Sequence, residues 1–231
     1  MIRAILTIDD ISSENTIDIV KYLNEKGITA VMFAEGQRIE RDPDPAVFAL
    51  QHGMIVGNHS YSHPAFSSLK VEEAAREIER CERQLDLLYR SAGVERRFRP
   101  FRFPYGDKGG ANKAALQEYL ADNGFHKLKD TQIPYPWWKE QGLDRDIDTL
   151  WTFDFAEYRI RRDSGFTLED VFGRINDPAP ESGAALLAEK GNHILLLHAH
   201  DETEALVPGY YRILIDTLLQ KGVVFDMPEF L

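Results

Sequence analysis

The stretch Ala4-Ile5-Leu6-Thr7-Ile8-Asp9-Asp10 sets two adjacent carboxylates directly after a short apolar run. Apolar, β-favouring residues over this length predict a buried strand, with the two acids at its C-terminal end. Ile17, Val20 and Leu23 then recur at helical spacing until Gly27, a residue type that commonly closes helices. The beginning of the chain therefore predicts a strand, an acidic loop and a helix, which is the repeating unit of parallel α/β folds.

Units of this kind recur to the end of the chain. Further β-favouring runs occupy residues 28–33, 54–56, 99–103, 125–127, 149–153, 193–198 and 223–225, and helical patterns occupy residues 44–53, 71–88, 111–123, 167–175, 182–190 and 208–220. About seven strands that alternate with helices and carry polar residues at their C-terminal ends indicate a parallel (β/α) barrel, whose functional sites lie on the loops at that face.

The length of the chain refines this fold. Since 231 residues is fewer than the roughly 250 of a TIM barrel with eight units, we expect a distorted or incomplete TIM-like barrel. An open doubly wound sheet is the alternative, but no Gly-x-Gly-x-x-Gly motif follows the first strand.

Composition favours one large domain and narrows the choice of partners. The chain has 43% hydrophobic and 28% charged residues, and no Pro/Gly/Ser-rich linker or charge block divides it, so we expect a single domain over residues 1–231. The formal net charge of −11 argues against a nucleic acid or an anionic membrane surface, because phosphate binding needs clustered Lys and Arg. A neutral or cationic substrate suits this charge better.

The sequence also bears on the cellular compartment. The residues Met1-Ile2-Arg3 lead directly into the first strand without a visible signal peptide, and no run of about 18 apolar residues could span a bilayer. Cys81 is the only cysteine, so an intrachain disulfide is excluded. A single cysteine is compatible with a reducing compartment. It lies on the apolar stripe of the helix expected at residues 71–88, where we interpret it as a small core residue. We expect a cytoplasmic protein.

The residues Gly57-Asn58-His59-Ser60-Tyr61-Ser62-His63-Pro64 place two imidazoles four positions apart. On one helical turn, positions i and i+4 share a face, so His59 and His63 could bind the same ion. A pair of polar loop histidines is the alternative, because the bare pattern is common. Asp10 would add a carboxylate from another strand end, and three protein ligands with one open position are what a catalytic zinc ion needs.

Further polar residues at strand ends suit acid–base chemistry. Asp9 stands beside a candidate ligand, where it could take a proton from water, and Arg102 could hold its carboxylate ionised. His198 ends the most apolar strand and is the natural candidate for an acid. A carboxylate at Asp154 or Glu157 would be the partner of its ring.

Five ordered motifs between Thr7 and Asp201 resemble those of the polysaccharide deacetylase family, also called the NodB homology domain or carbohydrate esterase family four. Thr7-Ile8-Asp9-Asp10 is similar to the family's Thr-Phe-Asp-Asp, and residues 57–64 match its His-Ser/Thr-x-x-His motif with the flanks intact. Arg102-Phe103-Pro104-Tyr105-Gly106 resembles Arg-Pro-Pro-Tyr-Gly, and Leu196-Leu197-His198 resembles Leu-x-His. In the fourth motif, Trp-x-x-Asp-x-x-Asp-Trp, the final pair is replaced by Glu157-Tyr158.

The resemblance implies a metal-dependent hydrolase that removes an N-acetyl group from an amino sugar or glycan precursor. It implies that Asp10, His59 and His63 bind a divalent metal ion, most often zinc in this family, and that Asp9 is the general base. Such an ion lowers the pKa of its bound water from 15.7 to about 7 and polarises the amide carbonyl.

The resemblance also assigns the remaining roles. The backbone N–H of Tyr105 would stabilise the oxyanion, and His198 would protonate the departing amine. Arg102 would orient Asp9. Glu157 would orient His198 in place of the family's aspartate, with Asp154 as the substitute because the glutamate side chain is longer.

Other functions remain open at this point. An N-deformylase or a cyclic-amide hydrolase would use the same scaffold, and a non-catalytic carbohydrate-binding protein is a rival of another class. The retained acidic and histidine residues argue against the last. The expected partner is an acetylated amino sugar, an oligosaccharide or a sugar-linked precursor. Without a visible export signal, we favour a nucleotide- or lipid-linked precursor of a surface polysaccharide.

Three further features are interpreted without a catalytic role. Tyr135-Pro136-Trp137-Trp138 lies in a long irregular stretch. This stretch either contacts sugar faces, or it covers the side of the barrel or builds a dimer contact. His200 and Asp201 are interpreted as loop residues. His193 begins its strand and would lie at the opposite end of the barrel, where we expect a structural role.

Overall fold

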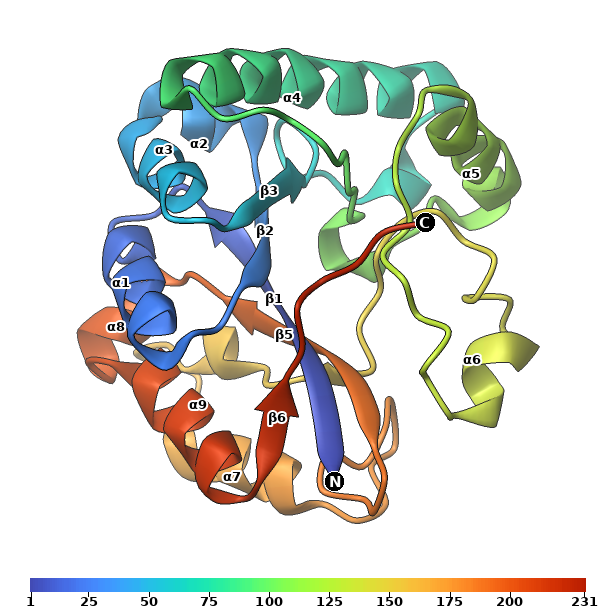
Figure 1. Cartoon of the computed structure of the whole chain (residues 1–231). Coiled ribbons are helices and arrows are strands. Elements are labelled where there is room, and N and C mark those ends of the chain that lie inside the picture. Colours follow the sequence, from blue (N-terminus) through green and yellow to red (C-terminus); the bar gives the residue numbers. More distant parts are fainter.

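Six parallel strands form one sheet in the computed structural model, which describes residues 1–231 (Figure 1). The sheet order is β3-β2-β1-β5-β4, and β6 pairs with the first residues of β1. The strands are β1 (Ile2–Ile11), β2 (Ala30–Ala34), β3 (Ile55–Asn58), β4 (Phe153–Asp154), β5 (Asn192–His198) and β6 (Val223–Phe225). The longest strand, β1, is therefore central, and its C-terminal end carries the acidic pair.

Helices surround these strands, and Figure 1 shows α1 to α4 and α7 to α9 around their outside. The helices are α1 (Thr16–Lys26), α2 (Gly36–Arg41), α3 (Asp44–Gln51), α4 (Val71–Ala92), α5 (Lys113–Asp122), α6 (Pro136–Glu140), α7 (Leu168–Asn176), α8 (Asp201–Leu206) and α9 (Tyr210–Gln220). None of them combines the length and the apolar character that crossing a bilayer requires.

The expected distorted parallel barrel is confirmed, and its closure is irregular. Beyond β3, Asn58 N donates to Pro100 O at 2.9 Å and Arg102 N donates to Asn58 O at 3.0 Å. Thr149 N donates to Phe101 O at 2.8 Å, and the chain then runs into β4 beside β5. Isolated hydrogen bonds thus bridge the gap between β3 and β4. The predicted strand at residues 99–103 is reduced to one bridge, because Pro100 has no N–H to donate to a ladder.

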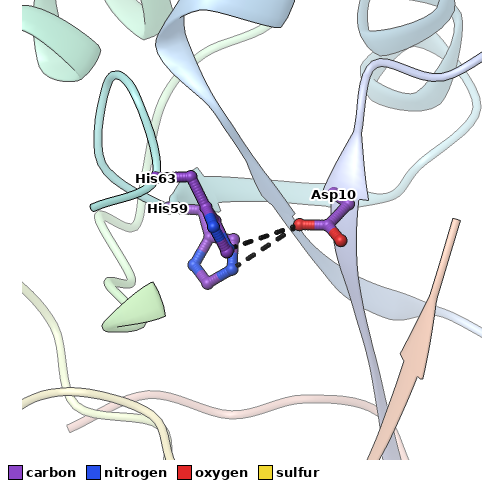
Figure 2. Close-up of side chains that lie close together, drawn as sticks. All are labelled: Asp10, His59 and His63. Atoms are coloured by element: carbon purple, nitrogen blue, oxygen red, sulfur yellow. Dashed lines mark ion pairs between the residues drawn. The ribbon is translucent and has the colours of Figure 1, made fainter. Parts of the chain in front are cut away.

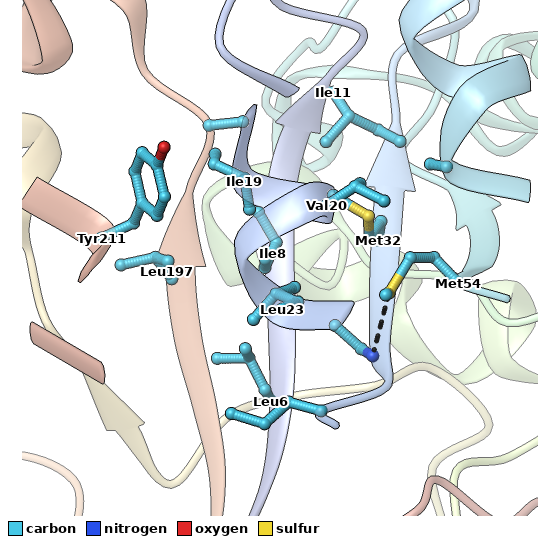
Figure 3. Close-up of a cluster of buried hydrophobic side chains, with 14 of the residues drawn as sticks. Leu6, Ile8, Ile11, Ile19, Val20, Leu23, Met32, Met54, Leu197 and Tyr211 are labelled. Atoms are coloured by element: carbon cyan, nitrogen blue, oxygen red, sulfur yellow. Dashed lines mark hydrogen bonds between the residues drawn. The ribbon is translucent and has the colours of Figure 1, made fainter. Parts of the chain in front are cut away.

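The alternation of side chains along β1 separates the outer core from the barrel interior. Leu6 and Ile8 point outward and belong to the large cluster between sheet and helices. In Figure 3 they lie against Ile19, Val20 and Leu23 of α1. Because successive side chains of a strand face opposite sides, the side chains of residues 5, 7 and 9 point into the barrel. This register directs the Asp9 carboxylate inward.

The stretch between residues 128 and 143 fills the barrel below that carboxylate. Leu128, Ile133, Trp138 and Leu143 form a buried cluster with the inward-facing residues Ile5, Val31, Phe33 and Ile194. The indole N–H of Trp138 donates to Asp130 Oδ2 at 2.7 Å, so this polar atom is satisfied inside the core. The barrel is therefore plugged at one end, and its opening lies at the C-terminal ends of the strands.

Two further local predictions were wrong because the backbone of each segment bonds to residues far along the chain. Residues 182–190 form turns instead of a helix. Ala184 N donates to Thr152 O at 2.8 Å, and Gly183 passes so close to that carbonyl, with φ of +78°, that a Cβ would lie 2.7 Å from it. Residues 125–127 form no strand, since His126 N donates to Arg99 O and Lys127 O accepts from Leu231 N, and neither partner lies in a strand. The loop after β3 also differs from its prediction, but there the cause is its own side-chain hydrogen bonds.

Candidate active site

A cavity of about 460 Å³ opens at the C-terminal ends of the strands. The sequence-predicted residues Asp9, Asp10, His59, His63, Tyr105, Asp154 and His198 all line it, and Arg102 and Glu157 lie fully buried behind its wall. The sequence assigned no role to the other lining residues, which are Glu35, Gln37, Arg38, Ser62, Trp151, Tyr158, Arg161, Leu196 and His200. Glu35 directly follows β2, so the strand-end rule that selected Asp10 could have selected it too.

Asp10, His59 and His63 converge on one point, and Figure 2 shows the two imidazoles facing the carboxylate. Asp10 Oδ1 lies 3.8 Å from His59 Nε2 and 3.7 Å from His63 Nε2. The three candidate ligand atoms all lie within 4.8 Å of one another. Asp10 Oδ1 is buried and makes no hydrogen bond. A buried carboxylate oxygen without a partner is costly, so this donor set fits a divalent cation.

The charges around Asp10 favour its ionised form. Burial alone would raise its pKa, but the nearby histidines, with His198 first, and Arg38 lower it below the ordinary value. Arg38 also donates to the backbone carbonyl of Asp10 at 3.0 Å. Asp10 itself adopts φ of +65°, an uncommon conformation for a residue with a side chain. The carboxylate is therefore held in place by a strained strand end.

The loop that carries the two histidines is not helical, which corrects the assumption of one helical turn. Ser60 and His63 have φ of +64° and +60°. The Asn58 side chain accepts from Ser60 N at 2.8 Å and donates to Glu82 Oε1, also at 2.8 Å. Ser60 Oγ accepts from His63 N at 3.1 Å. The loop is thus shaped by side-chain hydrogen bonds, and α4 holds it through Glu82.

A backbone hydrogen bond sets the tautomer of His59. Its Nδ1 lies 2.9 Å from the carbonyl oxygen of Arg102, which can only accept. Nδ1 must therefore carry the hydrogen, which leaves the lone pair of Nε2 facing Asp10. Orientation of this kind is typical of histidines that bind metal ions.

Arg102 lies inside the barrel and holds Asp9. Its guanidinium donates to Asp9 Oδ1 at 2.7 Å, to the hydroxyl of Thr7 at 2.8 Å and to the carbonyl of Thr149 at 2.9 Å. The charged group also lies 4.5 Å from the centre of the Phe33 ring. The buried charge of Arg102 thus requires the Asp9 carboxylate as its counter-ion. The second oxygen of Asp9 lies 3.4 Å from His59 Nε2.

Glu157, not Asp154, contacts the ring of His198. Its Oε1 lies 3.1 Å from His198 Nδ1 and accepts from the backbone N–H of His198 at 2.5 Å. Burial alone would lower the pKa of His198, but the charge of Glu157 and this hydrogen bond, with smaller effects of Asp10 and Asp9, raise the pKa to about 10. Asp154 instead accepts from Ala156 N at 2.7 Å within its own turn. His198 is therefore held in the protonated form, with Nε2 free to donate.

Tyr105 occupies a tight turn beside His63. Its φ is +60°, and its ring lies edge-on to that of His63, with centres 4.6 Å apart. Gly106 N and Asp107 N donate back to Phe103 O and Pro104 O, both at 3.0 Å. These bonds do not use the Tyr105 N–H, which leaves this donor for a ligand.

The histidines without an assigned role lie in different places. His200 is the N-cap residue of α8, where its Nδ1 accepts from Thr203 N at 3.2 Å, and its ring lines the cavity. Burial, followed by the charge of Arg161, lowers the pKa of His200. His193 is buried far from the cavity beside Tyr135, whose hydroxyl lies 3.0 Å from Nε2. Cys81 is buried in the outer core.

The fold and site together define an α/β-barrel protein with a candidate metal centre at the open face of the barrel. Residues 2–126 match the family model described as polysaccharide deacetylase. Since this match covers more than half of the chain, the protein belongs to the polysaccharide deacetylase family.

Two curated relatives carry names that specify substrates. A peptidoglycan-N-acetylglucosamine deacetylase of Bacillus cereus is 32% identical over 103 residues, which are 44% of this chain and 36% of the relative. Chitin deacetylase 1 of Cryptococcus neoformans is 32% identical over 185 residues, which are 75% of this chain and 38% of the relative. The chain thus spans little more than a third of the length of these relatives.

Solved structures show the same fold at lower identity. The polysaccharide deacetylase Bc1974 from Bacillus cereus aligns with a TM-score of 0.64 and 22% identity, over 96% of this chain and 90% of that one. A pseudoenzyme of carbohydrate esterase family 4 from Bacillus anthracis aligns with a TM-score of 0.62 and 19% identity, over 96% of this chain and 63% of that one. The fold is therefore common to active and inactive proteins, and function must be argued from the site.

Proposed function

We propose that this protein is a metal-dependent hydrolase that removes an N-acetyl group from an amino sugar, in a glycan or in a sugar-linked precursor. The observation that carries the proposal is that Asp10, His59 and His63 meet in the same cavity as Asp9 and His198. The first three can hold a cation, and the last two can accept and donate protons. The names of the curated relatives, which refer to peptidoglycan and chitin, support an acetylated amino sugar as substrate.

Asp10, His59 and His63 would hold the cation. Two imidazoles and one carboxylate suit zinc, with an open position for water or substrate. When bound, a divalent cation supplies an activated water, whose pKa falls from 15.7 to about 7, and polarises the acyl oxygen.

Asp9 would serve as the general base. Arg102 fixes one of its oxygens at 2.7 Å and leaves the other directed toward the candidate ligands. This oxygen would take a proton from the attacking water as the new C–O bond forms. The free N–H of Tyr105 would donate to the acyl oxygen as its negative charge develops, which stabilises the transition state more than the substrate.

His198 would serve as the general acid. Glu157 holds Nδ1 of its ring, so the proton that is transferred comes from Nε2. This proton would go to the amide nitrogen as the C–N bond breaks, which gives a free amine and acetate. Asp9 and His198 approach the reacting amide from neighbouring strands, because residues 9 and 198 are paired in register between β1 and β5.

The first experiment joins metal analysis with an acetate-release assay. The protein should contain about one equivalent of divalent metal and release acetate from an N-acetylated oligosaccharide. His59→Ala and His63→Ala should lose both properties, whereas His52→Ala, at an exposed histidine after α3, should keep both. Full activity after complete removal of metal would contradict the proposal.

A comparison of substrates tests the reaction class and the substrate. Formyl, acetyl and cyclic-amide compounds should be offered side by side, together with acetylated sugar nucleotides and N-acetylglucosamine oligomers. We expect acetyl compounds to be preferred. Metal binding without turnover of any of them would favour the non-catalytic alternative.

A further inference from the structure

The backbone of His198 lies at the end of β5, where the neighbouring strand β4 has already ended. The last backbone bond from that side comes from Phe155 N, which donates to Leu196 O at 3.2 Å. The polar backbone groups of a strand point alternately to its two neighbours, so those of His198 face the same side as those of Leu196. No strand is left there to pair with them, and buried backbone groups need other partners.

Two side chains take the place of the missing strand. Glu157 Oε1 accepts from His198 N at 2.5 Å, and the hydroxyl of Tyr210, the first residue of α9, contacts His198 O. The same hydroxyl oxygen lies 3.1 Å from His200 N and 3.4 Å from Asn15 Nδ2, and both of these groups donate to it. A tyrosine hydroxyl has one hydrogen. This hydrogen must therefore go to the carbonyl of His198, which can only accept.

Tyr210 is a fixed donor. Its side chain is fully buried, and its ring lies edge-on to that of Tyr211 with centres 5.6 Å apart. Burial, followed by the charge of Glu157, raises the pKa of the Tyr210 hydroxyl, so this group keeps its hydrogen. Glu157 Oε1 contacts both the backbone N–H and the ring Nδ1 of His198. The ring therefore keeps its contact with Glu157 only while the backbone of His198 keeps its place.

We propose that Tyr210 is a positioning residue for His198, whose carbonyl it holds so that the ring stays on Glu157 and Nε2 points to the departing amine. Tyr210 lines no part of the active-site cavity, so it acts through His198 and not on the substrate. The inference rests on the proposed function and makes it more specific. It predicts a defect that appears only when the leaving group needs a proton.

Two substrates that differ in their leaving group test this role. Tyr210→Phe removes the hydroxyl and keeps the buried ring. On an N-acetylated oligosaccharide, kcat should fall about tenfold, which is part of the roughly 10²–10⁴-fold that acid–base catalysis contributes, and KM should stay within about twofold. On p-nitrophenyl acetate, whose leaving group departs as an anion without a proton, kcat should stay within about twofold. An equal fall on both substrates, or no fall on the amide, would overturn the proposal.

The adjacent tyrosine provides a matched control. Tyr211 is buried on the same helix, its hydroxyl accepts from Arg212 Nε at 3.3 Å, and it lies beside Leu197 in the outer core (Figure 3). Tyr211→Phe should leave both reactions within about twofold of the parent. Should Tyr210→Phe fail to fold, Asn15→Asp replaces a donor to the Tyr210 hydroxyl by an acceptor of the same size, which draws the hydrogen away from His198. This variant should lose amide turnover selectively, and the absence of a selective loss would overturn the proposal.

Proton NMR separates this proposal from the proposed function, because it needs no turnover. The ring proton between His198 Nδ1 and Glu157 should give a low-field resonance in the parent, as expected of a charge-assisted hydrogen bond, and His198→Gln should lack it. In Tyr210→Phe this resonance should move to higher field or broaden, whereas Tyr211→Phe should retain it. Its absence from the parent, or an unchanged resonance in Tyr210→Phe, would overturn the positioning role. The expected change in a parent protein that releases no acetate would support the positioning role and contradict the deacetylase proposal.

Discussion

Replacement of Glu157 by glutamine should lower the pH at which the protein loses activity on the alkaline side. The substitution removes a negative charge but keeps the size of a fully buried side chain. Glu157 contacts the His198 ring at 3.1 Å, and its charge helps to raise the pKa of that histidine to about 10. Since His198 must be protonated to donate to the amine, loss of this charge should release the proton at lower pH.

Two limits bracket the size of this effect. A neutral hydrogen bond in place of a charge-assisted one is weaker by roughly 1–1.5 kcal/mol, which corresponds to about one pH unit. Loss of the attraction between two unit charges about 4 Å apart, at an effective dielectric constant of about 20, removes about 4 kcal/mol, or about three pH units. We therefore expect the basic limb of the kcat profile to move down by about one to three pH units. A bound cation would lower the starting value of this limb in both proteins.

The assay is acetate release from an N-acetylated oligosaccharide across the pH range, at saturating substrate and with equal metal content in each variant. Asp154→Asn is the matched control, because its carboxylate bonds to its own turn, and its basic limb should stay near that of the parent. An unchanged limb in Glu157→Gln would refute the reasoning. A limb that moves only in Asp154→Asn would assign the partner role to Asp154.

Further predictions concern the base, the loop support and stability in acid. The Asp9→Asn variant should keep its bound metal, and its turnover should fall by about 10²–10⁴-fold. Loss of the metal as well would show that Asp9 is a metal ligand. Glu82→Gln removes the charge that pairs with Arg96 and Arg99, although Asp86 remains beside Arg96, and it should lower the free energy of unfolding in urea by about 1–3 kcal/mol. A glutamine oxygen can still accept from Asn58, so metal affinity should persist, and unchanged stability would contradict this prediction. Burial lowers the pKa of His193 to about 4, so the folded state resists protonation of this histidine. The free energy of unfolding should therefore fall by up to about 3 kcal/mol as the pH drops from about 6.5 toward 4. Urea denaturation at both pH values should show a smaller fall for His193→Gln than for the parent, and an identical fall would show that His193 does not cause the loss of stability.

Local sequence predicted the repeating units well because hydrophobic periodicity is a local property. The strand that carries Asp9 and Asp10, the long amphipathic helix α4 and the apolar strand β5 all lie close to their predicted ranges. The predictions failed where the backbone bonds to a partner far along the chain. Residues 182–190 turn because Ala184 donates to Thr152, and no pattern within that segment records such a bond.

The residue types of the candidate site could likewise be selected from sequence, since strand ends and ordered motifs named Asp10, His59 and His63. Only the tertiary structure decided how they meet. The histidine loop takes its shape from Asn58 and from Glu82 on α4, not from a helical turn.

The remaining choices depend on distances across the barrel, which spacing along the chain does not contain. Glu157 rather than Asp154 contacts His198, because Asp154 is occupied by its own turn. Trp137 and Trp138 are adjacent in the sequence, which does not distinguish them. The short helix α6 places the Trp138 indole in the barrel core and the Trp137 indole at a cavity of about 630 Å³ beside the candidate active site. The sequence by itself therefore determined the candidate ligands and acid–base groups of the site and most of its repeating strand–helix units, and packing between distant segments decided which group acts on which.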